Sequence, residues 1–149
     1  MKNLFDSNNY QEVMYRLNQL TAQSARQWGK MDVAQMLAHC KEAFKVPLSP
    51  QSPPRMLIGI LIGWMMKAKL YNDSPWGKNL PTAPNFIIKD ERVFEQEKQA
   101  LVNLVTRFYQ ANPADIEKIV HPMFGSFTGQ QWGMAMYKHL DHHLRQFGV

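Results

Sequence analysis

The alternation of hydrophobic and polar positions along the chain indicates a succession of amphipathic helices. Between residues 8 and 20, apolar side chains recur every three or four positions, which is typical of a helix with one buried face. These are Tyr10, Val13, Met14, Leu17 and Leu20. We expect Ser7 or Asn8 to cap this helix. The same spacing predicts helices over about 32–46, 54–71 and 90–110, and a last one from residue 128 toward the end of the chain. The predicted fold class is all-α, in a single domain over residues 1–149.

Polar residues at the expected helix starts support these boundaries. Asp32 with Gln35, and Thr128 with Gln131, have the three-residue spacing of a capping box. Asp90 is expected to cap the fourth helix. Between residues 112 and 120 we expect one helical turn, and from 121 to 129 a loop that leads into the last helix.

The segment from Met56 to Met66 is the one long apolar run. Its eleven residues are about half of what a bilayer crossing needs. We interpret it as a buried core helix, with an interfacial membrane helix as the alternative. Gly59 and Gly63 in this helix would let a neighbouring segment approach closely.

Residues 72–88 read as a long loop, which in a small domain is often functional. We expect it to form a lid or pocket wall in which Trp76 and Lys78 are the reachable side chains. The alternative is a loop that simply covers the core.

Composition narrows the class of protein. A chain of 149 residues with 45% hydrophobic content can bury one ordinary core. The net charge of +5 forms no dense basic stripe, so we expect no nucleic-acid binding. The single Cys40 falls on an apolar stripe and is interpreted as a buried structural thiol. Without a disulfide or a secretory signal pattern, a cytoplasmic location is expected.

Three of the five histidines lie within residues 139–143. In a helix, His139 and His143 are one turn apart and project from the same face, so both imidazoles can reach one metal ion. His142 lies on the polar stripe with Lys138 and Arg145, and we expect it to point toward water.

Two imidazoles are too few for a tight site, so a third ligand is needed. His39 lies on a predicted helix, whereas His121 precedes a proline in a predicted loop. A ligand on a rigid helix is the better candidate. The other interpretation of His39 is a half-buried imidazole satisfied by a carbonyl or a carboxylate.

Two segments together resemble the DinB/YfiT-like superfamily: the early Gln35-Met36-Leu37-Ala38-His39 and the late run from His139 to Gln146. Trp28-Gly29-Lys30-Met31, the loop 121–125 and the run 138–148 resemble its uncharacterised branch DUF1569. The resemblance implies a four-helix bundle of up-down-down-up order. It also implies a divalent metal held by His39, His139 and His143. Some superfamily members are transferases that use a low-molecular-weight thiol.

The residues around these histidines bear on the chemistry. Zinc and nickel both suit imidazole ligands. Gln35 and Gln146 are spaced to act behind the ligands or on a substrate, and Tyr137 and His121 are candidate proton carriers. No carboxylate except Glu42 stands at helical spacing beside a proposed ligand, which favours transfer of a thiol over hydrolysis.

The sequence therefore predicts a metal-dependent enzyme that acts on a small, electrophilic molecule, either a thiol transferase or a hydrolase. The alternative is a non-catalytic bundle that binds a metal or ligand or mediates dimerisation. A third hypothesis is an interfacial membrane protein that uses residues 56–66. We expect no membrane insertion, and a homodimer is compatible with the pattern.

Overall fold

In the computed structural model, which describes residues 1–82 and 84–149, four long helices pack side by side. The helices are α1 (Ser7–Gln19), α2 (Val33–Lys45), α3 (Leu57–Lys67), α4 (Phe94–Gln110), the single turn α5 (Pro113–Ile116) and α6 (Gly129–Gln146). Two 3₁₀ turns, η1 (Ala68–Leu70) and η2 (Pro84–Phe86), and two short strands, β1 (Val120–His121) and β2 (Gly125–Ser126), complete the fold. The protein is all-α apart from this small antiparallel hairpin.

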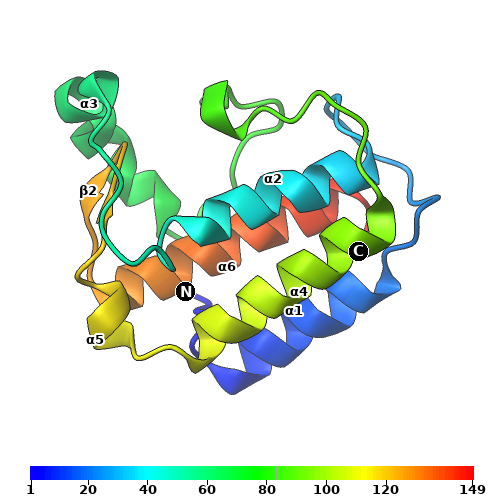
Figure 1. The fold of residues 1–149 in the computed structure, drawn as a ribbon, viewed down its shortest axis with the longest axis horizontal. Helices are drawn as coiled ribbons and strands as arrows, with labels where there is room; N and C mark the ends of the chain where they lie inside the picture. The colour runs from blue at the N-terminus through cyan, green and yellow to red at the C-terminus, as the bar shows by residue number, and fades with distance from the viewer. Residues whose placement is uncertain (83) are drawn as a thin grey trace.

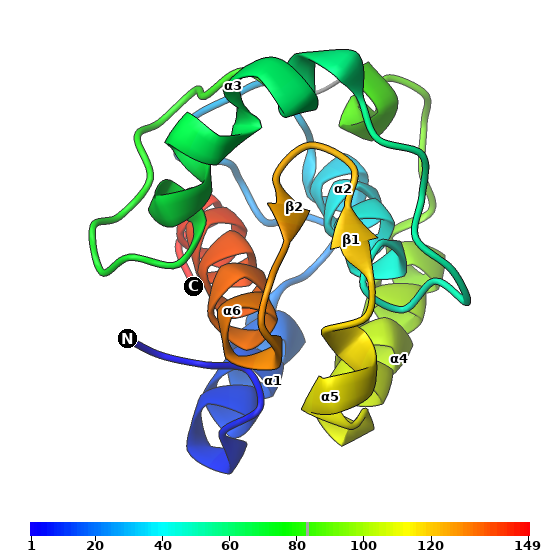
Figure 2. The ribbon, with the colours of Figure 1, turned by 90° about the vertical axis from the view of Figure 1, so that its left-hand side faces the viewer.

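The core lies between α1, α2, α4 and α6, which contact one another through their apolar stripes. Leu17, Leu37, Phe108 and Leu140, one from each helix, are fully buried there. The colours in Figures 1 and 2 show that α1 and α6 run in one direction and α2 and α4 in the other. This packing places the inner face of α2 against the inner face of α6.

Two helix starts confirm the predicted capping boxes. Asp32 accepts from the backbone N–H of Gln35 while the Gln35 side chain accepts from Asp32 N–H, and Thr128 and Gln131 form the same reciprocal pair. The predicted turn after residue 112 is α5, whose start is capped by Asn112. These local signals were sufficient to predict the helix starts, because each depends only on residues within one turn.

Other boundaries differ from the prediction. Asp6, rather than Ser7 or Asn8, caps α1 by accepting from two backbone N–H groups. The helix α4 begins at Phe94, and Asp90 instead pairs with Arg92. The predicted loop 121–129 contains the strand β2, because the chain turns back on itself between His121 and Gly125.

The prediction that residues 56–66 form a buried core helix is wrong. The helix α3 forms, yet of its residues only Gly59 and Gly63 are buried. It packs on the hairpin and on η1, where the glycines let the backbone of Met123 approach. Figure 2 shows α3 arching over the hairpin, apart from the four long helices. Within the described residues, no helix is both long enough and apolar enough to cross a membrane.

Candidate metal centre

Three histidines from α2 and α6 meet between these two helices. His39 Nε2 lies 3.1 Å from His139 Nε2, and the ring centroid of His143 is 4.7 Å from that of His39 and 4.8 Å from that of His139. One ligand nitrogen from each ring can be chosen so that all three lie within 4.8 Å of one another. In the described part of the chain, this is the one group of three or more His, Cys, Asp or Glu side chains placed to hold a single ion.

The helical repeat explains this arrangement. His139 and His143 are one turn apart on α6 and so share a face, as the sequence predicted. His39 is buried on the face of α2 that packs against α6, beside Met36 and Cys40 of the core. Cys40 itself is fully buried, and burial raises the pKa of its thiol well above the usual range. Cys40 therefore stays protonated and acts as a core residue.

In two of these imidazole rings, a hydrogen bond at one nitrogen determines that the other nitrogen keeps its lone pair. His39 Nδ1 lies 2.8 Å from the backbone oxygen of Phe86 in η2. Since a carbonyl oxygen only accepts, Nδ1 carries the hydrogen and Nε2 keeps its lone pair. The expected alternative for His39, an imidazole bonded to a carbonyl, is thus present at Nδ1 and leaves Nε2 available.

Gln146 determines which nitrogen of His143 carries the hydrogen. Its Nε2 donates to the backbone oxygen of Trp28 at 2.9 Å, which turns its Oε1 toward His143 Nδ1 at 2.8 Å. The His143 Nδ1–H therefore donates to the amide, and His143 Nε2 keeps its lone pair. Gln146 is only 3% exposed, so no water competes for this bond. Gln146 is thus hydrogen-bonded to one of the three candidate ligands, on the nitrogen that an ion would not use.

His139 tests whether the trio fits a metal ion. Its Nε2 faces His39, and its buried Nδ1 has no hydrogen-bond partner among the described residues. This Nδ1 is not the nitrogen that faces His39, so the fit to an ion is judged from the two Nε2 atoms instead. Two nitrogens on one tetrahedral zinc lie about 3.3 Å apart, which is close to the spacing of His39 and His139. The donor set and its spacing thus fit a divalent transition metal.

Burial keeps all three imidazoles in the neutral form that metals bind. It lowers the pKa of His139 well below the usual range, helped by the neighbouring His143 and His39. Burial, with His39 nearby, lowers the pKa of His143 to about 3. The pKa of His39 is also lowered by burial, against the opposing effect of its bond to Phe86. At neutral pH no proton has to leave before an ion can bind.

Aromatic side chains cover the outer side of the trio. The ring of Trp76, from the segment 72–88, lies 5.8 Å from that of His139 and 5.6 Å from that of His142. The Trp28 ring also lies near His142, with the two ring centroids 5.8 Å apart. His142 is half-buried and packs near both indole rings, so the expectation that it points toward water is wrong. The helical stripe could not reveal this, because the covering residues come from distant connectors.

The segment 72–88 is tied to α6 beside the histidines. Lys138 Nζ donates to the backbone oxygens of Lys69 and Asn72, and Trp76 Nε1 donates to the same Lys69 oxygen at 2.8 Å. The Lys78 ammonium lies 4.8 Å from the Trp28 ring. Residue 83 of this segment lies outside the described residues. Nothing in the sequence pattern marked Lys138 or the Phe86 carbonyl, because their partners lie far away in the chain.

The other predicted site residues, Gln35, His121 and Tyr137, do not belong to the trio. Gln35 is occupied by the capping box of α2 and by a bond from its Nε2 to the Asp90 oxygen. His121 stands at the hairpin, where its Nδ1 accepts from the backbone N–H groups of Met123 and Phe124. Burial beside Arg55 lowers the pKa of His121 to about 4.

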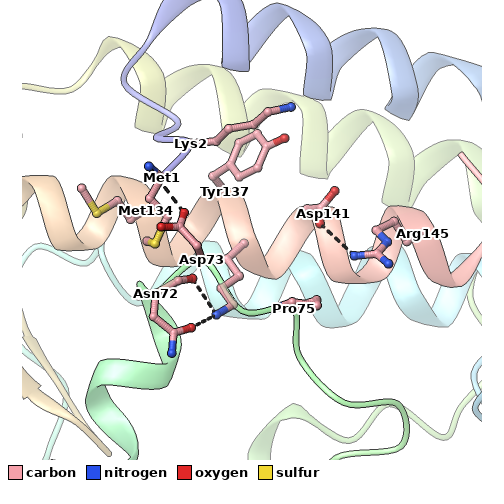
Figure 3. Close-up of a pocket in the computed structure, with 10 residues that line it drawn as sticks. Met1, Lys2, Asn72, Asp73, Pro75, Met134, Tyr137, Asp141 and Arg145 are labelled. Atoms are coloured by element: carbon pink, nitrogen blue, oxygen red, sulfur yellow. Dashed lines mark hydrogen bonds and ion pairs between the residues drawn. The ribbon is translucent and has the colours of Figure 1, made fainter.

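Tyr137 faces a different part of the molecule from the histidines. Two positions along α6 rotate a side chain by about 200°, so Tyr137 and His139 point to opposite sides. The Tyr137 hydroxyl donates to Glu12 at 3.0 Å, beside Lys2. Tyr137 lines a hollow of about 270 Å³, and none of the three histidines is among its lining residues. Figure 3 shows Tyr137 in the wall of this hollow.

Comparison with known proteins identifies the family of the chain. A scan against protein-family models matches residues 2–148 to the family described as "Protein of unknown function (DUF1569)". Searches of the curated proteins and of the solved structures found no match. Since the family model spans nearly the whole chain, including all three histidines, this protein belongs to the DUF1569 family.

Proposed function

We propose that this protein is a metal-dependent enzyme of the DinB/YfiT-like type that acts on a small electrophilic molecule. The observation that carries the proposal is the meeting of three neutral imidazoles, two of them held with Nε2 free. The opposed directions of α1 and α6 against α2 and α4 support the up-down-down-up bundle that the sequence resemblance implies.

His39, His139 and His143 would hold the ion, with zinc or nickel as the best match to an all-imidazole set. Such an ion supplies a Lewis-acid centre with at least one open position, where water or a thiol is made more acidic. Gln146 and the Phe86 carbonyl orient two of the ligands. Trp76 and Trp28 restrict the access of water from the outer side.

The side chains around the trio favour transfer of a thiol over hydrolysis. Hydrolysis at such a site generally uses a carboxylate as general base. The described cluster contains imidazoles and no carboxylate. The buried Cys40 is not available as a nucleophile, so a thiol would have to come from a separate low-molecular-weight cofactor. The half-buried His142, with its ring centroid 5.0 Å from that of His143, is a base that could take the thiol proton.

The test is the metal content of tag-free protein, measured by inductively coupled plasma mass spectrometry. We expect about one equivalent of a transition metal in the wild type. His39→Ala and His143→Ala should each lose the metal, while His142→Ala, which removes a neighbouring imidazole outside the trio, should retain it. Wild-type protein that remains metal-free after incubation with zinc and nickel would contradict the proposal.

Catalysis is tested next with the metal-loaded protein. Turnover of a model electrophile with glutathione, bacillithiol or mycothiol should disappear in His143→Ala and in chelated wild type. Metal binding without turnover of any thiol or ester substrate would instead support the non-catalytic metal-binding module.

A further inference from the structure

The helix α3 carries most of the exposed apolar surface of the described residues. Of their thirteen exposed large hydrophobic side chains, eight lie on this one helix: Leu57, Ile58, Ile60, Leu61, Ile62, Trp64, Met65 and Met66. Leu57 is 81%, Trp64 71% and Leu61 70% exposed. An apolar surface concentrated in this way marks a binding surface more often than an accident of folding.

The fold holds this surface outward. The two buried residues of α3 are Gly59 and Gly63, and both pack on the backbone of Met123 in the hairpin. At the helix start, Met56 N–H donates to the backbone oxygen of Pro122 at 2.9 Å. At its end, the Lys67 ammonium donates to the backbone oxygen of Ser126. The glycine side and both ends are therefore fixed, and the large side chains turn away from the protein.

The stretch of sequence that contains α3 is predominantly basic. Residues 43–89 contain six basic residues and a single acidic one, which gives a net charge of +5. The rest of the chain contains eleven basic and eleven acidic residues, so the whole positive excess belongs to the segment that carries α3. Arg55 and Lys69, next to the two ends of the helix, are exposed. Three of these basic residues adjoin the apolar surface in the sequence, since Lys67 is the last residue of α3 and Arg55 and Lys69 lie two residues from its ends.

We propose that α3 binds the surface of an anionic lipid bilayer. The helix would lie in the interface with its apolar side chains among the upper acyl chains and Trp64 at the headgroup level, while the exposed Arg55 and Lys69 meet anionic headgroups. A second copy of this chain is a poorer partner, because pairing through α3 would bring two segments of charge +5 together. The proposal does not depend on the metal centre.

The experiment is co-sedimentation with vesicles of phosphatidylcholine containing about 30% phosphatidylglycerol, compared with phosphatidylcholine alone. We expect the wild type to bind the anionic vesicles more tightly, and about 0.5 M sodium chloride to weaken the binding. Leu61→Glu should reduce the affinity at least about tenfold. Tyr15→Glu is the matched control, because it replaces an exposed apolar residue on α1 with the same change of charge. It should bind as the wild type does.

Two results would overturn the proposal. One is the absence of a difference in vesicle binding, either because the wild type does not bind anionic vesicles or because Leu61→Glu binds them with the same affinity. The other is self-association in sedimentation velocity that Leu61→Glu abolishes while vesicles have no effect, which would assign α3 to a second copy of the chain. Circular dichroism of the variants verifies the fold, and because Leu61 is exposed the substitution leaves the core intact.

Discussion

At the scale of single residues, the candidate centre depends on which nitrogen of each imidazole carries a hydrogen. Gln146 decides this for His143, because its amide is itself oriented by the Trp28 carbonyl. The hydrogen bonds from Trp28 through Gln146 to His143 thus join the connector after α1 to the face of α6 that carries His139 and His143. Residues that orient ligands in this way usually matter nearly as much as the ligands.

We predict that Gln146→Ala weakens metal affinity by about 10- to 100-fold while the three imidazoles remain in place. The reason is that His143 then loses the acceptor that holds Nδ1–H and leaves Nε2 free. A competition titration against a chromophoric chelator measures the change. Gln35→Ala is the control, since it removes one half of the capping box of α2 and should cost about 1 kcal/mol of stability with unchanged affinity. Equal affinity in Gln146→Ala and wild type would show that Gln146 does not orient His143.

At the scale of elements, the unusual feature is that an apolar helix is attached to the protein by its glycines. A helix that is apolar on all sides is normally buried. In α3 the hairpin fills only the groove along Gly59 and Gly63, and the four long helices have already covered one another. The hairpin therefore determines how α3 is presented.

Replacing Gly63 with alanine should detach α3 from the hairpin. A Cβ at this position would clash with the backbone oxygen of Met123, and a backbone group cannot swing aside as a side chain can. Against the roughly 1 kcal/mol that alanine adds to helix propensity, we expect a larger local loss of about 1–3 kcal/mol. Hydrogen exchange of the amides in α3 and the hairpin should accelerate.

Gly77→Ala is the matched control, because a Cβ there would only touch Leu80 Cδ2 at an ordinary 3.8 Å. Unchanged exchange in Gly63→Ala would mean that the contact between α3 and the hairpin relaxes without loss.

At the scale of the whole molecule, the histidines make stability depend on pH. All five have a pKa below the usual value, with burial as the largest cause in each case. The folded protein therefore binds fewer protons than the unfolded chain below pH of about 6.5. The stability that depends on the neutral histidines is fully present above this pH. It is lost as the pH falls toward the pKa of each folded-state histidine, which is about 4 for His121 and about 3 for His143.

His121→Asn isolates one part of this effect, because the asparagine amide can still accept from Met123 and Phe124 but does not titrate. Between pH 7 and pH 5, we expect the metal-free wild type to lose about 2 kcal/mol more stability than this variant. Urea unfolding in the presence of a chelator measures both proteins. The same loss in wild type and variant would show that His121 is not held neutral by the fold.

Much of this architecture is determined locally. The helices, their two capping boxes and the shared face of His139 and His143 follow from spacings within one or two turns, and such spacings are readable in a single sequence. The choice of His39 as the third histidine followed from its place on a helix. The error at Ser7 arose because several polar residues stand near the start of α1, and Asp6 is the one that caps it. The error at Asp90 has another origin, since α4 begins after Val93 without a side-chain cap while Asp90 pairs with Arg92.

Tertiary structure alone decided the rest. The Phe86 carbonyl and Trp76 reach the histidines from a connector with no periodic pattern. Trp76, together with Trp28 from another connector, packs against the half-buried His142. Hydrophobicity showed that α3 would be a helix but could not show its environment, because burial depends on whether another element remains to cover a face. In this protein the four long helices enclose a complete core, so α3 keeps its apolar side chains exposed.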